Sequence, residues 1–574
     1  MTSITEKPEQ CPPVDSADIR GGKSSPNEES IGRGGDEMQY PKGFTMAIIM
    51  SAVLLAMFLV ALDRTILGTA IPKITDQFDS LSDVGWYGSS YMLTNCSTQL
   101  IFGRIYKFYN TKWVLLICIA IFEVGSVICG AAPNSVSFII GRSIAGLGSA
   151  GIFLGAMMTV FHTIPLQKRP MYAGTFGALF GIASVIGPLV GGVFTDRVSW
   201  RWCFYINLPI GAVSFAVITL VFKLPQPKDA KLPLHQKLAQ LDPLGTICFL
   251  PAIVCLILAL QWGGTTYAWS SWRMILLLTM FSILIVMFAG IQIIKGDSGT
   301  LPPRILCHRS IAAGAYFTFC LASAMMLLTY YVPIWFQAVK RTSALESGIR
   351  LIPMVFSLVF ASIMSGQVTS RIGYYVPAML ISPILGGVGA GLMTTLKQDS
   401  GHPMWIGYQV LCGFGLGLAM QITGLVAQVV LAREDVSTGT ATMFFSQQLG
   451  GAIFVSAGQN VFLKSLVSGL GDVPGLSAIS IVNTGATDIQ KDVPQQYLPK
   501  VLNVYNHALT RTFLIATIMM ALSVLGSLAM EWRNIKKPSA PSQGPATNPS
   551  KESSKEEAGG DMNENLDRVD EGSV

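Results

Sequence analysis

Residues 174–194 read GTFGALFGIASVIGPLVGGVF, and this stretch constrains the fold more than any other part of the chain. It is long enough to cross a bilayer, because about 20 apolar helical residues span a hydrocarbon core of about 30 Å. Glycines let a neighbouring backbone approach, and proline disturbs the preceding helical turn. The glycines alone favour an ordinary tight helix contact, but the order Gly-Pro-x-x-Gly-Gly indicates a specialised transmembrane helix. Its marker residues are Gly181, Gly187, Pro188, Gly191 and Gly192.

The composition is typical of a polytopic membrane protein. Of the 574 residues, 51% are hydrophobic and only 13% are charged, against about 25% charged in soluble domains. The apolar runs are continuous rather than alternating, which predicts an all-α protein and not a membrane barrel. The net charge of +6 is dispersed, so no nucleic-acid partner is expected. The ten cysteines form no grouping with ligand spacing, so no metal site is expected.

Apolar runs read with a window of about 19 residues predict about fourteen membrane spans. Six precede a polar break that begins at Lys223, two follow that break, and six more complete the chain. The predicted spans are residues 44–70, 84–103, 113–131, 137–161, 171–194, 204–222, 244–261, 274–294, 311–335, 348–368, 376–394, 404–431, 439–462 and 509–530.

The spans divide the chain into five predicted parts. An N-terminal six-helix bundle covers residues 44–222, a linker with two extra transmembrane helices covers 223–310, and a C-terminal six-helix bundle covers 311–531. The tails, 1–43 and 532–574, have the polar composition of disordered ends, with a regulatory role as the alternative.

The short loops of the first half predict the orientation of the chain. The expected inner loops hold most of the basic residues, among them Arg104, Lys107 and Lys168. Lysines and arginines mark the cytoplasmic side of membrane proteins. An even number of spans then places both tails in the cytoplasm.

Four ionisable side chains lie inside predicted spans: Asp63, Arg64, Glu123 and Arg142. Each costs about 2.5–3.5 kcal/mol at a helix centre, so each is expected to face the bundle or water. A rise of about 1.5 Å per residue places Asp63 and Arg142 at similar depth, which makes them a plausible pair, and the adjacent Arg64 is an equally open partner for Asp63. Glu123 lies near the midplane with no cation at its depth. Such a carboxyl favours its protonated form, as a proton carrier requires, and a structural hydrogen-bonded acid is an equal alternative.

The two halves echo each other after their second spans. The first copy, GRIYKFYNTK, begins at Gly103, and the second, GQVTSRIGYY, begins at Gly366. Duplicated bundles around a midplane site are a recurrent transporter design. The echo therefore favours a transporter.

Four motifs together resemble the major facilitator superfamily, and within it the fourteen-span drug:proton antiporters. They are LDRTI from Leu62, RSIAGLGSAG from Arg142, GPLVGG from Gly187 and WRWCFYINLP from Trp200. The resemblance covers residues 44–531 and implies two six-helix bundles joined by two extra helices. Phrases such as FFSQQLGGAIF resemble the fungal branch that exports mycotoxins and other secondary metabolites.

The resemblance, read with the buried charges, implies roles for particular residues. Proton coupling is expected of Asp63, Glu123 and Arg142, and close packing that seals the outward leak is expected of the glycine-proline helix. The expected cytoplasmic gate loops contain Gly103, Arg104, Gly366, Arg371 and Gly373. One segment departs from the family pattern, because Lys107 and Asn110 stand where the family has an aspartate and a glycine. Other partners are therefore expected to serve that gate.

The sequence predicts a proton-coupled efflux transporter that exports bulky hydrophobic compounds, including drugs and toxins, by alternating access. Gln421, Gln447 and Gln448 are candidates for the substrate cavity, with interhelical hydrogen bonding at least as well supported. No enzymatic activity is expected, because no nucleophile, metal cluster or phosphate loop stands beside a partner. No cofactor is expected, and the proton gradient is the expected energy source. The protein is expected to be a monomer in the plasma membrane, with a vacuolar or vesicular membrane as the alternative. A proton symporter for siderophores or other nutrients, and a non-transporting receptor or scaffold, are the alternatives.

Overall fold

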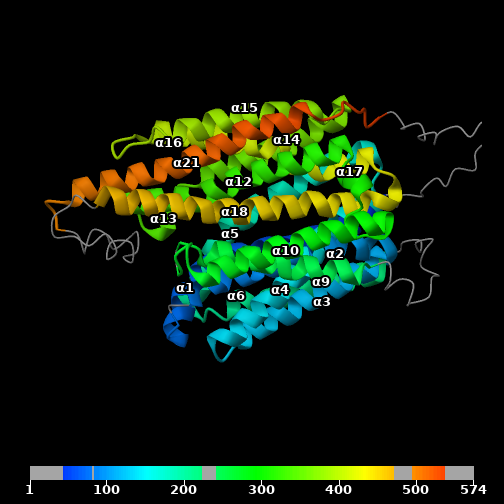
Figure 1. The fold of residues 1–574 in the computed structure, drawn as a ribbon, viewed down its shortest axis with the longest axis horizontal. Coiled ribbons are helices and arrows are strands. Elements are labelled where there is room, and N and C mark those ends of the chain that lie inside the picture. Colours follow the sequence, from blue (N-terminus) through cyan, green and yellow to red (C-terminus); the bar gives the residue numbers. More distant parts are fainter. Residues whose placement is uncertain (1–42, 81–82, 223–240, 265, 471–493, 537–574) are drawn as a thin grey trace, which may run out of the picture. The chain divides into compact units, whose positions relative to one another are not determined.

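The computed structural model describes residues 43–80, 83–222, 241–264, 266–470 and 494–536. The described chain is almost entirely helical (Figure 1). The helices of the first half are α1 (Phe44–Phe78), α2 (Val84–Phe108), α3 (Thr111–Ala131), α4 (Ser135–Thr163), η2 (Leu166–Lys168), α5 (Arg169–Arg197), α6 (Trp202–Tyr205) and α7 (Asn207–Val221). The linker contributes α9 (Pro243–Trp262), α10 (Trp272–Lys295), η4 (Gly296–Ser298) and α11 (Pro303–Leu306).

The second half follows without a further long polar break until residue 471. Its helices are α12 (Arg309–Ala338), α13 (Ala344–Ile349), α14 (Ile352–Ile372), α15 (Val376–Met393), α16 (His402–Ala419), α17 (Ile422–Val430), η5 (Arg433–Asp435), α18 (Val436–Leu470) and α21 (Leu498–Leu528). We call the end of the bundle where α1 begins and α21 ends the tail end, and the opposite end the far end.

Thirteen membrane-crossing segments, by length and apolar composition, lie in the described residues, which confirms the predicted all-α polytopic class. The second predicted span is the exception, since α2 is a helix of 25 residues but is not apolar enough to belong to that set. Its polar residues, among them Asn95 and Gln99, are buried inside the bundle. With α2 added, the long helices match the fourteen predicted spans.

Several helix boundaries differ from the predicted spans. The span predicted over 404–431 is divided into α16 and α17 at Met420 and Gln421, and the spans predicted over 439–462 and 509–530 are extended into α18 and α21. A hydropathy window ends where polarity rises, whereas a helix ends where its backbone hydrogen bonding stops.

The predicted tails fall mostly outside the described residues, which exclude 1–42 and 537–574. The start of the predicted C-terminal tail, residues 532–536, packs against the bundle. Ile535 is buried, and its backbone N–H donates to the carbonyl of Gly373 at 2.8 Å. Residues 532–536, which the prediction assigns to the tail, are therefore part of the packed bundle.

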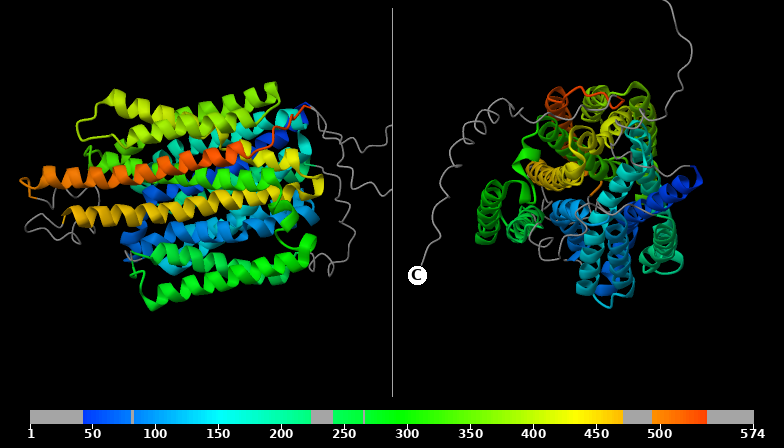
Figure 2. Two further views of the ribbon diagram at one scale, coloured as in Figure 1. Left: turned by 45° about the horizontal axis from the view of Figure 1, so that its top comes forward. Right: turned by 90° about the vertical axis from the view of Figure 1, so that its right-hand side faces the viewer.

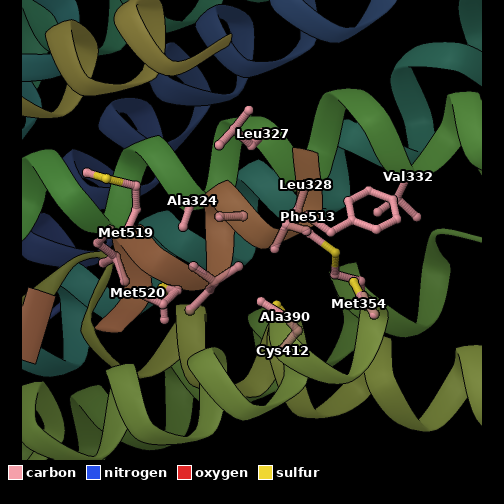
Figure 3. Packing of buried hydrophobic residues seen from close by; sticks show 14 of the residues in the cluster. Ala324, Leu327, Leu328, Val332, Met354, Ala390, Cys412, Phe513, Met519 and Met520 are labelled. Carbon is pink, nitrogen blue, oxygen red and sulfur yellow. The ribbon is translucent and has the colours of Figure 1, made fainter. Parts of the chain in front are cut away.

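The hydrophobic core of the second half is built by α12, α14, α15, α16 and α21. Figure 3 shows Leu328 of α12, Met354 of α14, Cys412 of α16 and Phe513 of α21 pointing toward one another. Small residues bring these helices close, because a Cβ on Gly389 of α15 would lie 2.6 Å from the Cα of Cys412. Such contacts are typical of helices that associate in membranes.

The two halves contact each other along two seams. In one seam α5 packs against α14, and in the other α2 packs against α18 (Figure 2). The linker helix α9 packs against both α2 and α18, and α10 packs on α9. The linker helices therefore cover the α2–α18 seam.

The halves are most tightly closed toward the tail end. Residues 436–444 of α18 are all buried, whereas residues 445–449 are partly exposed. Phe444 packs edge-to-face on Phe153 of α4 with ring centroids 4.3 Å apart, and Met157 of α4 packs against Gly424 of α17. Contacts of this kind join the first half to the second on the tail-end side of residue 445.

Candidate functional site

A buried ion pair joins α1 to α4. Nη1 of Arg142 lies 2.6 Å from Oδ2 of Asp63, and both side chains are almost completely buried. The structure thus selects the Asp63–Arg142 pair over the alternative with Arg64. The similar depth inferred from helical rise explains the pairing, because the two side chains meet across packed helices.

Further polar groups surround this ion pair. Nε of Arg142 donates to the carbonyl of Tyr87 at 3.0 Å, and its guanidinium lies 4.5 Å from the ring centroid of Tyr91. On the other side, Nδ2 of Asn207 lies 3.5 Å from Oδ1 of Asp63 and 3.1 Å from Oγ of Ser126. Charge-assisted hydrogen bonds of this type offset the cost of removing ions from water. Nothing in the sequence assigned either tyrosine to the ion pair. For Asn207 the only signal was its position, as a polar residue near the start of an apolar run.

Glu123 of α3 lies apart from this network of hydrogen bonds. Both of its carboxylate oxygens are buried and have no hydrogen-bond partner among the described residues. The carboxyl group lies directly against Gly211 of α7, where a side chain would collide with it. No cation pairs with Glu123 among the described residues, and the charged group that acts on it is Asp63. Buried polar groups are nearly always satisfied, so an exception of this kind calls for a functional explanation.

The glycine-proline helix α5 contacts both halves. A Cβ on Gly187 or Gly191 would collide with Thr65 or Thr69 of α1, and a Cβ on Gly181 would collide with Val359 of α14. The helix continues through Pro188 without interruption. Gly192 differs, since nothing lies within 4 Å of its Cβ position, so the expectation of close packing fails there.

The two echoing segments lie at the tail end, but mostly not in loops. Gly103 and Arg104 belong to α2, Gly366 and Arg371 belong to α14, and Gly373 caps α14 with φ +87°. The prediction of gate loops is wrong in this respect, because both helices continue past their apolar windows. Basic residues in the last helical turn, which favour the carbonyl end of a helix, support such an extension.

Each echoing segment nevertheless contacts the opposite half through its first glycine. A Cβ on Gly103 would lie 2.6 Å from the Cβ of Ala441 in α18, and a Cβ on Gly366 would collide with the carbonyl oxygen of Pro170 in α5. The two contacts are equivalent in the two halves. Arg371 is exposed, and its carbonyl accepts a hydrogen bond from Lys536.

Lys107, the departure from the family pattern, pairs with Asp435 at the start of the α18 segment. The two charged atoms are 2.9 Å apart, and Nη1 of Arg304 lies 2.8 Å from the other oxygen of Asp435. Arg304 also pairs with Asp297 at 2.9 Å, and the buried Arg104 donates to the Asp297 carbonyl at 3.3 Å. We call Lys107, Asp435 and Arg304 the tail-end charge cluster. It joins the first half, the linker and the second half.

The linker is anchored beside this cluster by Asp242, which caps α9. Its buried carboxylate accepts hydrogen bonds from Lys295 at 2.8 Å, from Gln292 at 2.8 Å, and from the backbone of Gly245 and Thr300. Burial raises the pKa of Asp242, but these hydrogen bonds outweigh burial and hold the pKa well below its usual range. The Asp242 side chain therefore stays ionised and holds α10 and the following segment to the start of α9.

The three predicted glutamines have different environments. Gln448 of α18 donates to Oδ1 of Asn95 in α2 at 2.6 Å, which favours the interhelical alternative for this residue. Gln447 lines a small hollow of about 10 Å³ in the second half, which is roughly the volume one water needs. Gln421 is buried at the break between α16 and α17, and its Nε2 has no partner among the described residues.

Comparison with known proteins agrees with this architecture. Residues 53–455 match the family model of the Major Facilitator Superfamily. The MFS-type efflux pump MFS1 of Trichophyton rubrum is 52% identical over 91% of this chain and 97% of its own length. The efflux pump aflT of Aspergillus parasiticus is 46% identical over 86% and 97%, and the rubrofusarin-specific efflux pump aurT of Gibberella zeae is 47% identical over 87% and 92%.

A solved structure shows the same fold at low sequence identity. The human organic anion transporter MFSD10 (TETRAN) superposes with a TM-score of 0.54 at 12% identity, over 83% of this chain and 99% of its own. The chain belongs to the Major Facilitator Superfamily. It is a multi-pass membrane transporter and not an enzyme, and its relatives include fungal efflux pumps.

Proposed function

We propose that this protein is a proton-coupled exporter of hydrophobic organic compounds, working as a monomer in the plasma membrane with its tail end in the cytoplasm. The names of the efflux pumps aflT and aurT support export, and the name of aurT gives rubrofusarin as its cargo; we infer that the compound exported here is a toxin, a secondary metabolite or a drug. The compound crosses between the two halves, and no cofactor takes part besides the proton gradient. Tight contacts at the tail end and partly exposed faces beyond residue 445 describe the state that opens toward the far end.

The observation that carries the proton coupling is the unpaired Glu123 carboxyl in the same half as the buried Asp63–Arg142 pair. A carboxyl without partners in a membrane helix can exchange a proton without breaking a hydrogen-bond network. Protonation of Glu123 changes the charge near the Asp63–Arg142 ion pair. The stability of this pair then changes, because it depends on the balance between desolvation and attraction. Rocking of the halves about the α5–α14 and α2–α18 seams then exposes the carboxyl to each side in turn.

Transport in proteoliposomes with an imposed pH gradient tests this function. Rubrofusarin is a suitable first cargo, given the name of aurT. In vesicles where the tail end of the protein faces the medium, we expect cargo uptake only when the vesicle interior is more acidic than the medium. Glu123→Gln should lose this dependence on the pH gradient. The control is Glu434→Gln, which alters an exposed carboxyl at the tail end.

Two results would contradict the proposal. If Glu123→Gln, Asp63→Asn and Arg142→Ala each retained full proton coupling, these three residues would have no role in it. Proton and cargo movement in the same direction would instead identify a symporter.

A further inference from the structure

Arg64 is a cation in the membrane-crossing helix α1, and no ion pair or hydrogen bond to its side chain exists among the described residues. Its Nε is buried without an acceptor. The neighbouring Asp63 is already engaged by Arg142 at 2.6 Å and lies near Asn207. An arginine in a membrane span is costly, and such residues mark substrate or ion pathways. Among the described residues, Arg64 is thus a cation without an acceptor.

The position of Arg64 on α1 places it where the closed part of the bundle ends. Met57 lies two turns toward the tail end on the same helical face and is completely buried. Gly68 lies one turn toward the far end on that face, is exposed, and has nothing within 4 Å of its Cβ position. Arg64 itself is half-buried. A molecule that enters from the far end along this face therefore reaches Arg64 before the helices close.

An aromatic ring and a local excess of positive charge complete the site. The Arg64 guanidinium lies 5.3 Å from the ring centroid of Tyr91, and Arg142 lies 4.5 Å from the same centroid. Because Asp63 and Arg142 form a neutral pair, the charge of Arg64 is not balanced by its neighbours. The Glu123 carboxyl lies against Gly211 of α7, close enough to Asp63 for their charges to interact, and forms no ion pair with Arg64.

We propose that Arg64 binds an acidic oxygen of the exported molecule, so that the substrates are aromatic phenols or carboxylic acids bound as anions. A guanidinium presents several N–H donors in a rigid plane, which suits a carboxylate or phenolate, and hydrogen bonds between ions are stronger than neutral ones. The ring system of the substrate lies along the exposed face of α1 toward Gly68, while the buried Tyr91 ring holds the Arg64 guanidinium in place. This inference rests on the proposed export function and adds the class of molecule that is exported.

Binding of two matched probes tests the proposal. The full-length protein in lipid nanodiscs is titrated with 9-anthracenecarboxylate and with 9-anthracenemethanol at pH 7, with probe fluorescence as the readout. The probes share their ring system and differ in the anionic group. We expect the wild type to bind the carboxylate about 10-fold more tightly or better. Arg64→Gln should bind both probes with similar affinity, and Arg64→Lys, which keeps the charge, should retain part of the preference.

The matched control is Arg273→Gln, because Arg273 also lies over a tyrosine, 4.6 Å from the Tyr267 centroid, but is exposed. It should keep the full preference. Equal binding of the probes by wild type, no binding of the carboxylate, or an unchanged preference in Arg64→Gln would each overturn the proposal. If Arg64→Gln does not fold, wild type and Arg64→Lys decide the question. Proton-driven transport of 9-anthracenecarboxylate is measured separately, so a wild type that binds this probe but does not export it refutes the proposed function and not the binding role of Arg64.

Discussion

The tail-end charge cluster should hold the halves closed at the tail end, and removing its central carboxylate should open them. In Asp435→Asn, Lys107 loses its ion-pair partner and Arg304 keeps only Asp297. In Lys107→Met, Asp435 keeps its contact with Arg304 at 2.8 Å. We therefore expect Asp435→Asn to favour the open tail end more strongly than Lys107→Met does.

The expected size follows from the geometry of the Lys107–Asp435 pair. At 2.9 Å the direct attraction is about 6 kcal/mol for an effective dielectric constant of about 20. Most of this is cancelled by desolvation, because the Asp435 side chain is 4% exposed and that of Lys107 is 15% exposed. A net coupling of about 1–2 kcal/mol is left, which changes a conformational equilibrium about 5- to 30-fold.

Distances between spin labels provide the assay. Labels at Lys168 in the first half and Glu434 in the second are both exposed at the tail end, and the exposed Cys307 is replaced by serine. Double electron–electron resonance in nanodiscs then measures the populations of short and long distances. A double-mutant cycle of Lys107→Met and Asp435→Asn gives the coupling between the two residues.

Either of two outcomes would refute this reasoning. Additive effects of the two substitutions would show that the pair has no coupling in the closed state. A larger effect of Lys107→Met than of Asp435→Asn would show that Arg304 does not share the Asp435 carboxylate. Glu434→Gln outside the cluster, measured with the label moved to Arg433, should leave the populations unchanged.

Three further predictions concern packing and stability. Asp63→Asn leaves Arg142 buried without its partner, so thermal unfolding in detergent should show a loss of about 3–5 kcal/mol, and a much smaller extra loss on adding Arg142→Met would support the pair. Gly187→Val should destabilise the α1–α5 contact and lower activity, whereas Gly192→Ala should be tolerated, since only the first position is filled by a neighbour; equal effects would contradict this. Because the folded-state pKa of Asp242 is depressed, its contribution should be complete above the unfolded pKa of about 4 and decrease only as the pH falls below it. Unfolding scans of wild type and Asp242→Ala at several pH values should therefore converge only in strong acid.

The sequence was sufficient for the helical class and the family because apolar length and motif order are local properties. It also limited the possible partners of Asp63 to two arginines, since helical rise alone placed Asp63 and Arg142 at one depth. It could not choose between Arg142 and Arg64 as the partner, because that choice depends on how α1 is rotated against α4. The break between α16 and α17 was likewise hidden inside one continuous apolar run.

Contacts between distant segments explain what else the sequence could not supply. Lys107 stood out as a departure, but its partners Asp435 and Arg304 lie far along the chain and come together only through the helix packing. Gly187 and Gly192 look alike in the sequence, yet only Gly187 faces a neighbouring helix. Whether Glu123 and Arg64 have partners also depends on helix packing, so only the structure shows that the Glu123 carboxylate oxygens and Nε of Arg64 have none among the described residues.

The unequal cover of the two seams affects how lipid-soluble molecules can approach. On the α2–α18 side, α9 packs against both halves and α10 lies on α9. On the α5–α14 side, no described pair of extra helices intervenes between the seam and the acyl chains. A hydrophobic molecule that has partitioned into one leaflet can thus reach the outer face of the α5–α14 seam directly, whereas α9 and α10 lie between the acyl chains and the α2–α18 seam. The rate of cargo capture would then depend on lipid composition as well as on the concentration in water.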